Sequence, residues 1–226
     1  MNIEPIGWVE TCFDEKFAVP RQSGLCPSSW GILHFHKEYQ NADLLRGLEG
    51  FSHVWLIFSF HQNLDQGWTP TVRPPRLGGN RRVGVLATRS TFRPNGLGLS
   101  VCRLEKVDLT NPPQLHLGGL DLVTGTPVFD VKPYVAYCDV IEAADSGYAS
   151  SPPLALPVEV LFGAAEIFES LPPRTRSLIT EVLAQDPRPA IHDDPERVYG
   201  VALAGWDVRF RVAATVEIVA IEQRRD

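Results

Sequence analysis

Short apolar segments recur along the first 134 residues, among many glycine and proline turns, and they constrain the fold most strongly. Runs of this length, rich in Val, Ile, Leu and Phe, are typical of strands joined by tight turns. The longest, HVWLIFSF at 53–60, predicts a strand that is buried on both faces. The residues therefore predict a mainly β protein, a barrel or a sandwich, with strands at 3–9, 31–36, 53–60, 83–88, 99–107, 114–120 and 126–134.

The pattern changes after residue 144, where DSGYASSPPLALP at 145–157 has the composition of a linker. Beyond it, apolar residues at helical spacing alternate with strand-like segments, whereas the first part predicts only one short helix, at 41–48, with Asn41 as its N-cap. The later pattern predicts helices at 158–171 and 172–185 and strands at 197–213 and 215–221. We expect a β domain and a small α+β domain, at residues 1–144 and 158–226.

Residues 71–100 contain six arginines and no Asp, Glu, Lys or His, although the chain has a formal net charge of −6. A cationic segment in an anionic protein indicates a site for an anionic partner. Arginine suits phosphate, carboxylate and stacked bases better than lysine does. For any single arginine a solvated loop position is the simpler interpretation, but six together favour a binding surface.

Polar residues that follow predicted strands form a second group of candidates. His61 and Gln62 come directly after the 53–60 strand, and a tight turn at 121–126 carries a carboxylate and two hydroxyls. Side chains at the end of a buried strand are held by a stiff scaffold. His34 and His36 lie on one predicted strand, but without a third ligand they indicate no metal site.

Several protein classes are excluded or disfavoured by the same sequence. No apolar run is long enough to span a membrane, and the N-terminus lacks the pattern of a signal peptide. The four cysteines form no CxxC pair, so we interpret all of them as reduced packing thiols of a cytoplasmic protein. Neither a phosphate-binding GxxxxGK loop nor a GxSxG nucleophile motif occurs.

Several blocks of the sequence closely resemble the TrmO/YaeB family of tRNA N6-methyltransferases. The blocks occur in order and extend over nearly the whole chain: KFAVPRQ (16–22), RGLEGFSHVWLIFSFHQN (46–63), TVRPPRLGGN (71–80), GVLATRSTFRPNGLGLS (84–100), GLDLVTGTPVFDVKPY (119–134) and AQDPRP (184–189). One departure follows the last block, where Ile191 stands in place of an expected aromatic residue and an acidic run at 192–196 comes after it.

The resemblance implies a single-sheet β barrel with a small C-terminal domain, a homodimer, and S-adenosylmethionine as the cofactor. The implied acceptor is N6 of threonylcarbamoyladenosine beside the anticodon of threonine tRNA, and the C-terminal domain is expected to hold the tRNA. No metal is implied. Carried over by motif, the cofactor residues are Pro20, Arg21, Gln22, His61, Gln62, Arg89, Leu99, Asp121, Leu122, Val123, Thr124, Gly125 and Thr126.

Chemistry suggests roles for some of these residues. Arg21 and Arg89 suit the carboxylate of the cofactor, and backbone groups near Leu99 and in the 121–126 turn suit its adenine. Methyl transfer is an in-line displacement that depends mainly on alignment. Because the acceptor nitrogen is conjugated to a carbonyl, we expect help in removing its proton, from His61 or Asp121. The remaining arginines are expected to contact RNA, namely Arg73, Arg76, Arg81, Arg82 and Arg93.

Three alternatives stay open at the level of the sequence. The arginines could join two copies of the chain instead of binding RNA. The chain could be an RNA-binding barrel without catalytic activity. It could also be a methyltransferase of the same family that acts on another adenosine or on a small molecule.

Overall fold

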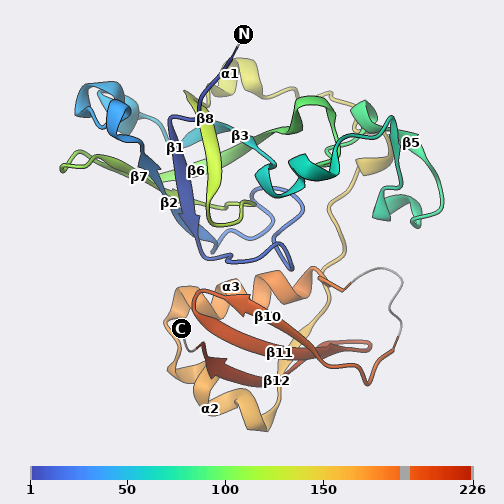
Figure 1. Cartoon of the computed structure of the whole chain (residues 1–226). Helices are drawn as coiled ribbons and strands as arrows, with labels where there is room; N and C mark the ends of the chain where they lie inside the picture. Colours follow the sequence, from blue (N-terminus) through green and yellow to red (C-terminus); the bar gives the residue numbers. More distant parts are fainter. Residues whose placement is uncertain (1, 189–193, 225–226) are drawn as a thin grey trace. The chain divides into compact units, whose positions relative to one another are not determined.

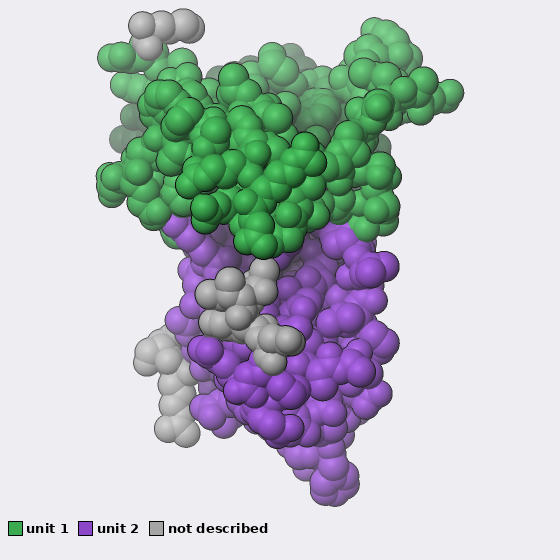
Figure 2. All heavy atoms as spheres, turned by 90° about the vertical axis from the view of Figure 1, so that its right-hand side faces the viewer, with its two compact units in different colours: residues 1–9, 33–116, 125–152 green, residues 10–32, 117–124, 153–226 purple. Residues whose placement is uncertain are grey.

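The computed structural model describes residues 2–188 and 194–224, so Ile191 and His192 lie outside the described residues. The chain forms two compact units, which Figure 2 colours separately. One comprises Met1–Val9, Leu33–His116 and Gly125–Pro152, and the other comprises Glu10–Ile32, Leu117–Thr124 and Pro153–Asp226. Two segments from the first half of the chain therefore belong to the same unit as the C-terminal segment.

Six strands close into a barrel in the order β1-β2-β7-β6-β3-β8, which confirms the mainly β fold and the single-sheet barrel (Figure 1). Alternate residues of each strand point into such a barrel and fill it. The fully buried side chains include Val9, Leu33, Val54, Leu56, Leu115, Leu117 and Val128. The strands are β1 Gly7–Thr11, β2 Trp30–Phe35, β3 His53–Ser59, β6 Leu97–Asp108, β7 Gln114–Gly118 and β8 Thr126–Pro133.

Strand β3 pairs antiparallel with both β6 and β8, and its two faces differ in burial. Val54, Leu56 and Phe58 are buried, whereas the intervening residues are only half-buried. The prediction of a strand buried on both faces was therefore wrong. On the outer face, Trp55 packs beside Tyr134, with ring centroids 5.9 Å apart, and donates its indole N–H to Asp139. The apolar residues of this face are thus partly covered by neighbouring side chains.

Two glycines allow β1 and β2 to approach closely. A Cβ at Gly7 would lie 2.1 Å from the carbonyl oxygen of His34, and one at Gly31 would lie 2.5 Å from that of Glu10. These obstacles are backbone atoms of the neighbouring strand, which cannot move without disturbing the barrel. Glycine is therefore required at both positions.

Replacing Gly7 with alanine is expected to destabilise the protein by about 1–3 kcal/mol, because the added methyl overpacks a backbone contact. For a chain of this size the melting temperature should fall by roughly 2–4 °C per kcal/mol. Gly84→Ala is the matched control, since nothing lies within 4 Å of its Cβ and its φ is −57°. Equal melting temperatures for the two variants in a thermal scan would rule out the close approach.

The C-terminal segment forms a four-stranded sheet in the order β10-β11-β12-β9, covered by helices (Figure 1). The predicted helix at 158–171 was wrong at its start, where three residues pair in parallel with β12 before the helix begins. The second predicted helix is confirmed. The elements are β9 Val158–Val160, α2 Phe162–Ser170, α3 Pro173–Ala184, β10 Tyr199–Leu203, β11 Trp206–Val212 and β12 Val216–Gln223.

The arginine-rich segment is less regular than predicted. The expected strand at 83–88 was wrong: β5 is only Val83–Gly84, paired with β4 Thr71–Val72, and a 3-10 turn follows.

At 41–48 the helix is also a 3-10 turn, although Asn41 caps it as expected by accepting from the Asp43 N–H. The helical elements of this part are α1 Ala136–Asp139, η1 Lys37–Tyr39, η2 Ala42–Leu45, η3 Leu48–Gly50, η4 His61–Gln66, η5 Pro75–Leu77, η6 Val85–Ala87, η7 Pro94–Gly96 and η8 Gly147–Ala149. Among the described residues, no helix is both long and apolar enough to cross a membrane.

Candidate functional site

The segment that follows β1 and the turn that precedes β8 are joined by backbone hydrogen bonds within one unit. Gly24 donates to the Gly119 carbonyl at 2.9 Å, and Gly119 donates to the Ser29 carbonyl at 3.0 Å. Further along, the N–H of Thr124 donates to the Phe13 carbonyl at 2.8 Å. The structure thus places the segment containing Pro20, Arg21 and Gln22 in the same unit as Asp121–Thr124.

Two threonine hydroxyls hold the turn against the end of β1. The Thr11 hydroxyl donates to the Leu122 carbonyl at 2.9 Å and accepts from the Phe13 N–H at 3.1 Å. In return, the Thr124 hydroxyl accepts from the Thr11 N–H at 3.0 Å and donates to the Thr11 carbonyl at 3.1 Å. The backbone on both sides of Val123 is therefore fixed by buried or partly buried bonds.

Asp121 is a half-buried residue whose neighbours are both anchored. The carbonyl of Leu120 accepts from the Ser29 hydroxyl at 3.0 Å, and the carbonyl of Leu122 accepts from the Thr11 hydroxyl. Anchoring on either side limits the positions that the carboxylate can adopt, which is the property that a positioned catalytic or binding group needs.

The predicted residues at 20–22 differ in exposure. Pro20 is buried, Arg21 is exposed and Gln22 is half-buried. The Gln22 side-chain amide donates to the Arg21 carbonyl. The Arg21 guanidinium is thus accessible on a segment whose backbone is fixed next to a buried proline.

In the other unit, His61 and Gln62 begin η4 directly after β3, as the sequence predicted. The N–H of Phe60 donates to the Gly96 carbonyl at 2.8 Å, which ties the start of η4 to η7. Leu99 lies on β6 opposite Ile57, with 54% of its surface exposed. The half-buried His61 and the exposed Leu99 are therefore both carried by the β3–β6 pair.

The arginines of residues 71–100 are mostly exposed, and several are anchored by neutral oxygens. Arg76 donates to the Ser151 carbonyl, Arg82 to the Thr71 hydroxyl, and Arg93 to the Thr88 carbonyl at 3.0 Å. Five of these arginines are predicted to contact RNA, namely Arg73, Arg76, Arg81, Arg82 and Arg93. Within residues 2–188 and 194–224, none of the five forms an ion pair with a carboxylate. Their charge is therefore not neutralised by acidic side chains of the described chain.

The predicted cofactor residues fall into two sets. One unit contains Pro20, Arg21, Gln22 and Asp121–Thr124, and the other contains His61, Gln62, Arg89, Leu99, Gly125 and Thr126. Thr11 was missed by sequence reasoning because its hydroxyl contacts residues 111 and 113 positions away. No local pattern signals such a pairing.

Metal-ligating side chains do not gather in the described part of the chain, where no group of three His, Cys, Asp or Glu residues could hold an ion. His34 stacks on Trp8 with ring centroids 4.6 Å apart, so this ring is part of the aromatic packing on the outside of the barrel.

The cysteines divide into three buried thiols and one exposed thiol, so the prediction of four packing thiols was wrong for Cys138. Burial raises the pKa of Cys12 to about 12 and raises the pKa of Cys26 still further. These thiols stay protonated in the folded chain while an unfolded chain begins to ionise near pH 9. Folding stability should therefore decline as the pH rises from about 9 towards 12.

We expect one thiol of the native protein to react with a thiol reagent at pH 8, and four after denaturation. A reagent must reach the thiol before it can react, and Cys138 is exposed whereas Cys12, Cys26 and Cys102 are buried. Cys138→Ser should abolish the native reaction. Rapid labelling of a second native thiol would contradict the burial of the other three.

Comparison with known proteins identifies the family. The model of the tRNA-methyltransferase O N-terminal domain matches residues 8–140, and that of the TrmO C-terminal domain matches residues 154–224. The chain belongs to the TrmO family. The resemblance seen in the sequence is thereby confirmed.

Relatives of the TrmO-family chain match it from end to end. It is 48% identical to a tRNA (adenine(37)-N6)-methyltransferase of Escherichia coli strain K12, over 99% of this chain and 98% of that one. It is 47% identical to a putative S-adenosylmethionine-dependent methyltransferase RcsF of Pseudomonas aeruginosa, over 92% of this chain and 90% of that one. The crystal structure of TrmO from Pseudomonas aeruginosa matches with a TM-score of 0.82 and 38% identity, over 98% of each chain.

Proposed function

We propose that this TrmO-family chain transfers a methyl group from S-adenosylmethionine to N6 of adenine 37 of tRNA. The similarity to the Escherichia coli enzyme carries the proposal, because it extends over 99% of this chain and 98% of that one. In finer detail, we propose that the adenine carries a threonylcarbamoyl group on a threonine tRNA and that the chain acts as a homodimer. Residues 1–144 would then supply the methyltransferase barrel, and 158–226 would contact tRNA.

The chemistry of the predicted residues fits the proposed cofactor. S-adenosylmethionine presents a carboxylate, an ammonium, ribose hydroxyls, an adenine edge and a sulfonium. The guanidinium groups of Arg21 and Arg89 suit the carboxylate, and the Asp121 carboxylate suits a ribose hydroxyl or the ammonium. Gly125 has a φ of +84° and nothing within 4 Å of where its Cβ would be, so the turn leaves room for a ligand to approach its backbone.

When bound, the cofactor supplies an electrophilic methyl group on a sulfonium. The task of the chain is to hold the reactants in line, which by itself contributes much of the acceleration in such reactions. Since the acceptor nitrogen is conjugated and holds a proton, we propose that Asp121 or His61 accepts that proton. Both are half-buried and start from anchored backbone, so little reorganisation is needed.

The arginines of residues 71–100 are proposed to contact tRNA phosphates or to stack on loop bases. Arg73 and Arg81 are the clearest cases, since both are exposed and neither is held by another described residue. Replacing both with alanine is expected to make the dependence of log K on log salt shallower by about 1.5, because each lost phosphate contact removes roughly 0.7–0.9 from the slope.

Filter binding of tRNA at several salt concentrations measures this slope. Arg46→Ala is the matched control, as Arg46 lies outside residues 71–100 and is exposed beside Asp43. The control should leave the slope unchanged. A flat salt dependence of the wild-type protein would instead favour a role of these arginines between two copies of the chain.

Titration calorimetry with S-adenosylmethionine separates an enzyme from an RNA-binding barrel without catalytic activity. We expect one cofactor to bind per chain in the micromolar range or tighter. The absence of binding heat, with tRNA binding intact, would favour the non-catalytic barrel. The acceptor is tested separately by analysis of the tRNA product.

A further inference from the structure

One face of helix α3 contacts the segment that leads into the proposed cofactor turn. Arg174, Leu178, Glu181 and Gln185 follow one another at spacings of four, three and four residues, so they lie on the same side of the helix. All of the contacts that follow are within one of the two compact units, which contains residues 10–32, 117–124 and 153–226.

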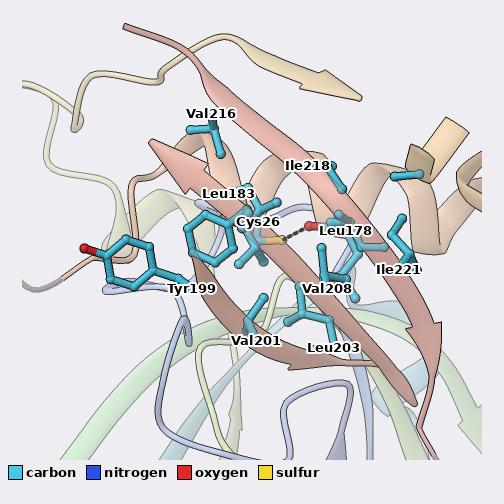
Figure 3. Packing of buried hydrophobic residues seen from close by; sticks show 14 of the residues in the cluster. Cys26, Leu178, Leu183, Tyr199, Val201, Leu203, Val208, Val216, Ile218 and Ile221 are labelled. Carbon is cyan, nitrogen blue, oxygen red and sulfur yellow. Dashed lines mark hydrogen bonds between the residues drawn. The ribbon is translucent and has the colours of Figure 1, made fainter. Parts of the chain in front are cut away.

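The carboxylate of Glu181 caps the loop at residues 26–28. One oxygen accepts from the Ser28 N–H at 2.8 Å and the other accepts from the Ser28 hydroxyl at 2.8 Å. The Cys26 thiol also lies 3.3 Å from the first oxygen and packs among the buried side chains of α3 and the sheet (Figure 3). A single carboxylate side chain thus accepts from three donors of a loop that has no regular structure.

Arg174 and Gln185 extend this contact in both directions. The Arg174 guanidinium donates to the carbonyls of Ser28 and Ser29 at 2.9 and 3.0 Å and lies over the Trp30 ring, 5.2 Å from its centroid. The Gln185 amide donates to the Leu25 carbonyl at 3.2 Å. Leu25, Cys26, Ser28, Ser29 and Trp30 are therefore each in contact with α3 or with Gln185 at its end.

The same loop residues hold the proposed cofactor turn on their other side. Ser29 accepts from the Gly119 N–H with its carbonyl and donates to the Leu120 carbonyl with its hydroxyl. Gly24 donates to the Gly119 carbonyl. A continuous chain of hydrogen bonds thus runs from Glu181 and Arg174, through residues 24–29, to the backbone next to Asp121.

We propose that Glu181 and Arg174 of the C-terminal domain are positioning residues for the cofactor site, acting through residues 25–29 on the turn that begins at Asp121. This inference rests on the proposed function, since it assumes that the turn binds S-adenosylmethionine. It assigns to α3 a task other than contact with tRNA. The C-terminal domain then completes the cofactor site of its own chain.

The test uses the full chain with Glu181→Ala, Glu181→Gln and Arg174→Ala. Glu181→Ala leaves both Ser28 donors without their acceptor, and we expect the Kd and the KM for S-adenosylmethionine to rise about tenfold or more. Turnover at saturating cofactor and the Kd for tRNA should stay within twofold of the wild type. Glu181→Gln keeps an acceptor oxygen and should recover part of the affinity.

Two controls separate positioning from general loss of stability. Thr180→Ala changes the residue that precedes Glu181 in α3. Its exposed hydroxyl donates only to the Arg176 carbonyl. Ile221→Val trims the same buried core at a residue of β12, outside the loop. Both controls should keep the wild-type KM for S-adenosylmethionine, even where the melting temperature of Ile221→Val falls.

Two outcomes would overturn the inference alone. In one, Glu181→Ala and Arg174→Ala bind the cofactor as the wild type does. In the other, turnover falls with an unchanged KM, which indicates a smaller folded fraction. If the wild-type chain binds no S-adenosylmethionine, the proposed function fails and the inference fails with it.

Discussion

At least one of two substitutions, Asp121→Asn and His61→Ala, is expected to lower the turnover of methyl transfer by about 100- to 10,000-fold, the usual contribution of a positioned acid or base. The acceptor nitrogen shares its electrons with the ring and with a carbonyl, so it reacts readily only as its proton leaves. Asn keeps the shape of the aspartate side chain and removes only its charge. The anchored carbonyls of Leu120 and Leu122 should preserve the turn in Asp121→Asn.

The measurement is a single-turnover assay at saturating S-adenosylmethionine, which removes any effect on cofactor affinity. Asp207→Asn serves as the control, because it makes the same change in an exposed residue of β11. It should react at the wild-type rate. If both His61→Ala and Asp121→Asn also do so, neither residue accepts the proton and alignment alone carries the reaction.

Thr11→Val is expected to lower the free energy of unfolding by about 2–4 kcal/mol. The substitution keeps the shape of the side chain and removes the hydroxyl of a residue that is 9% exposed. It leaves the Leu122 carbonyl and the Phe13 N–H without partners, and each such buried group costs about 1–3 kcal/mol. Because the turn then loses its register, we also expect the Kd for S-adenosylmethionine to rise by about tenfold, which is equivalent to about 1.4 kcal/mol.

Denaturant unfolding and cofactor titration measure the two effects. Thr215→Val is the matched control, because this half-buried threonine precedes β12 and its hydroxyl bonds to none of the described residues. The control should change neither quantity appreciably. A Thr11→Val protein as stable as the control would show that the hydrogen bonds of the Thr11 hydroxyl contribute little to the free energy of unfolding.

Local patterns were sufficient to predict most of the barrel. The β2, β3, β6, β7 and β8 strands were found within two residues at either end, because each is a short apolar run closed by glycine, proline or a polar residue. The strand at 83–88 failed for a physical reason. VGVLAT has strand-like composition, but only two of its residues find a partner strand, and Val85–Ala87 turn instead.

Long-range relationships were beyond such patterns. Nothing near Cys12 or Cys26 indicates that these residues pack in one core with Leu178 and Phe210. Likewise, the sequence gives no sign that Glu181 differs from any other carboxylate on a helix. Only the structure shows that Ser28 donates two hydrogen bonds to it. His61, Gln62 and the 121–126 turn were candidates from the residues alone, and family resemblance added others such as Pro20 and Leu99. The framework that holds them became visible only in three dimensions.

Mass spectrometry of nucleosides from treated tRNA tests the central claim most directly. Threonine tRNA carrying threonylcarbamoyladenosine is incubated with the protein and S-adenosylmethionine, digested and compared with a reaction that lacks the protein. We expect the modified adenosine at position 37 to gain the mass of one methyl group, located on N6 by fragmentation. An unchanged adenosine 37 under conditions where the protein binds both cofactor and tRNA would contradict it.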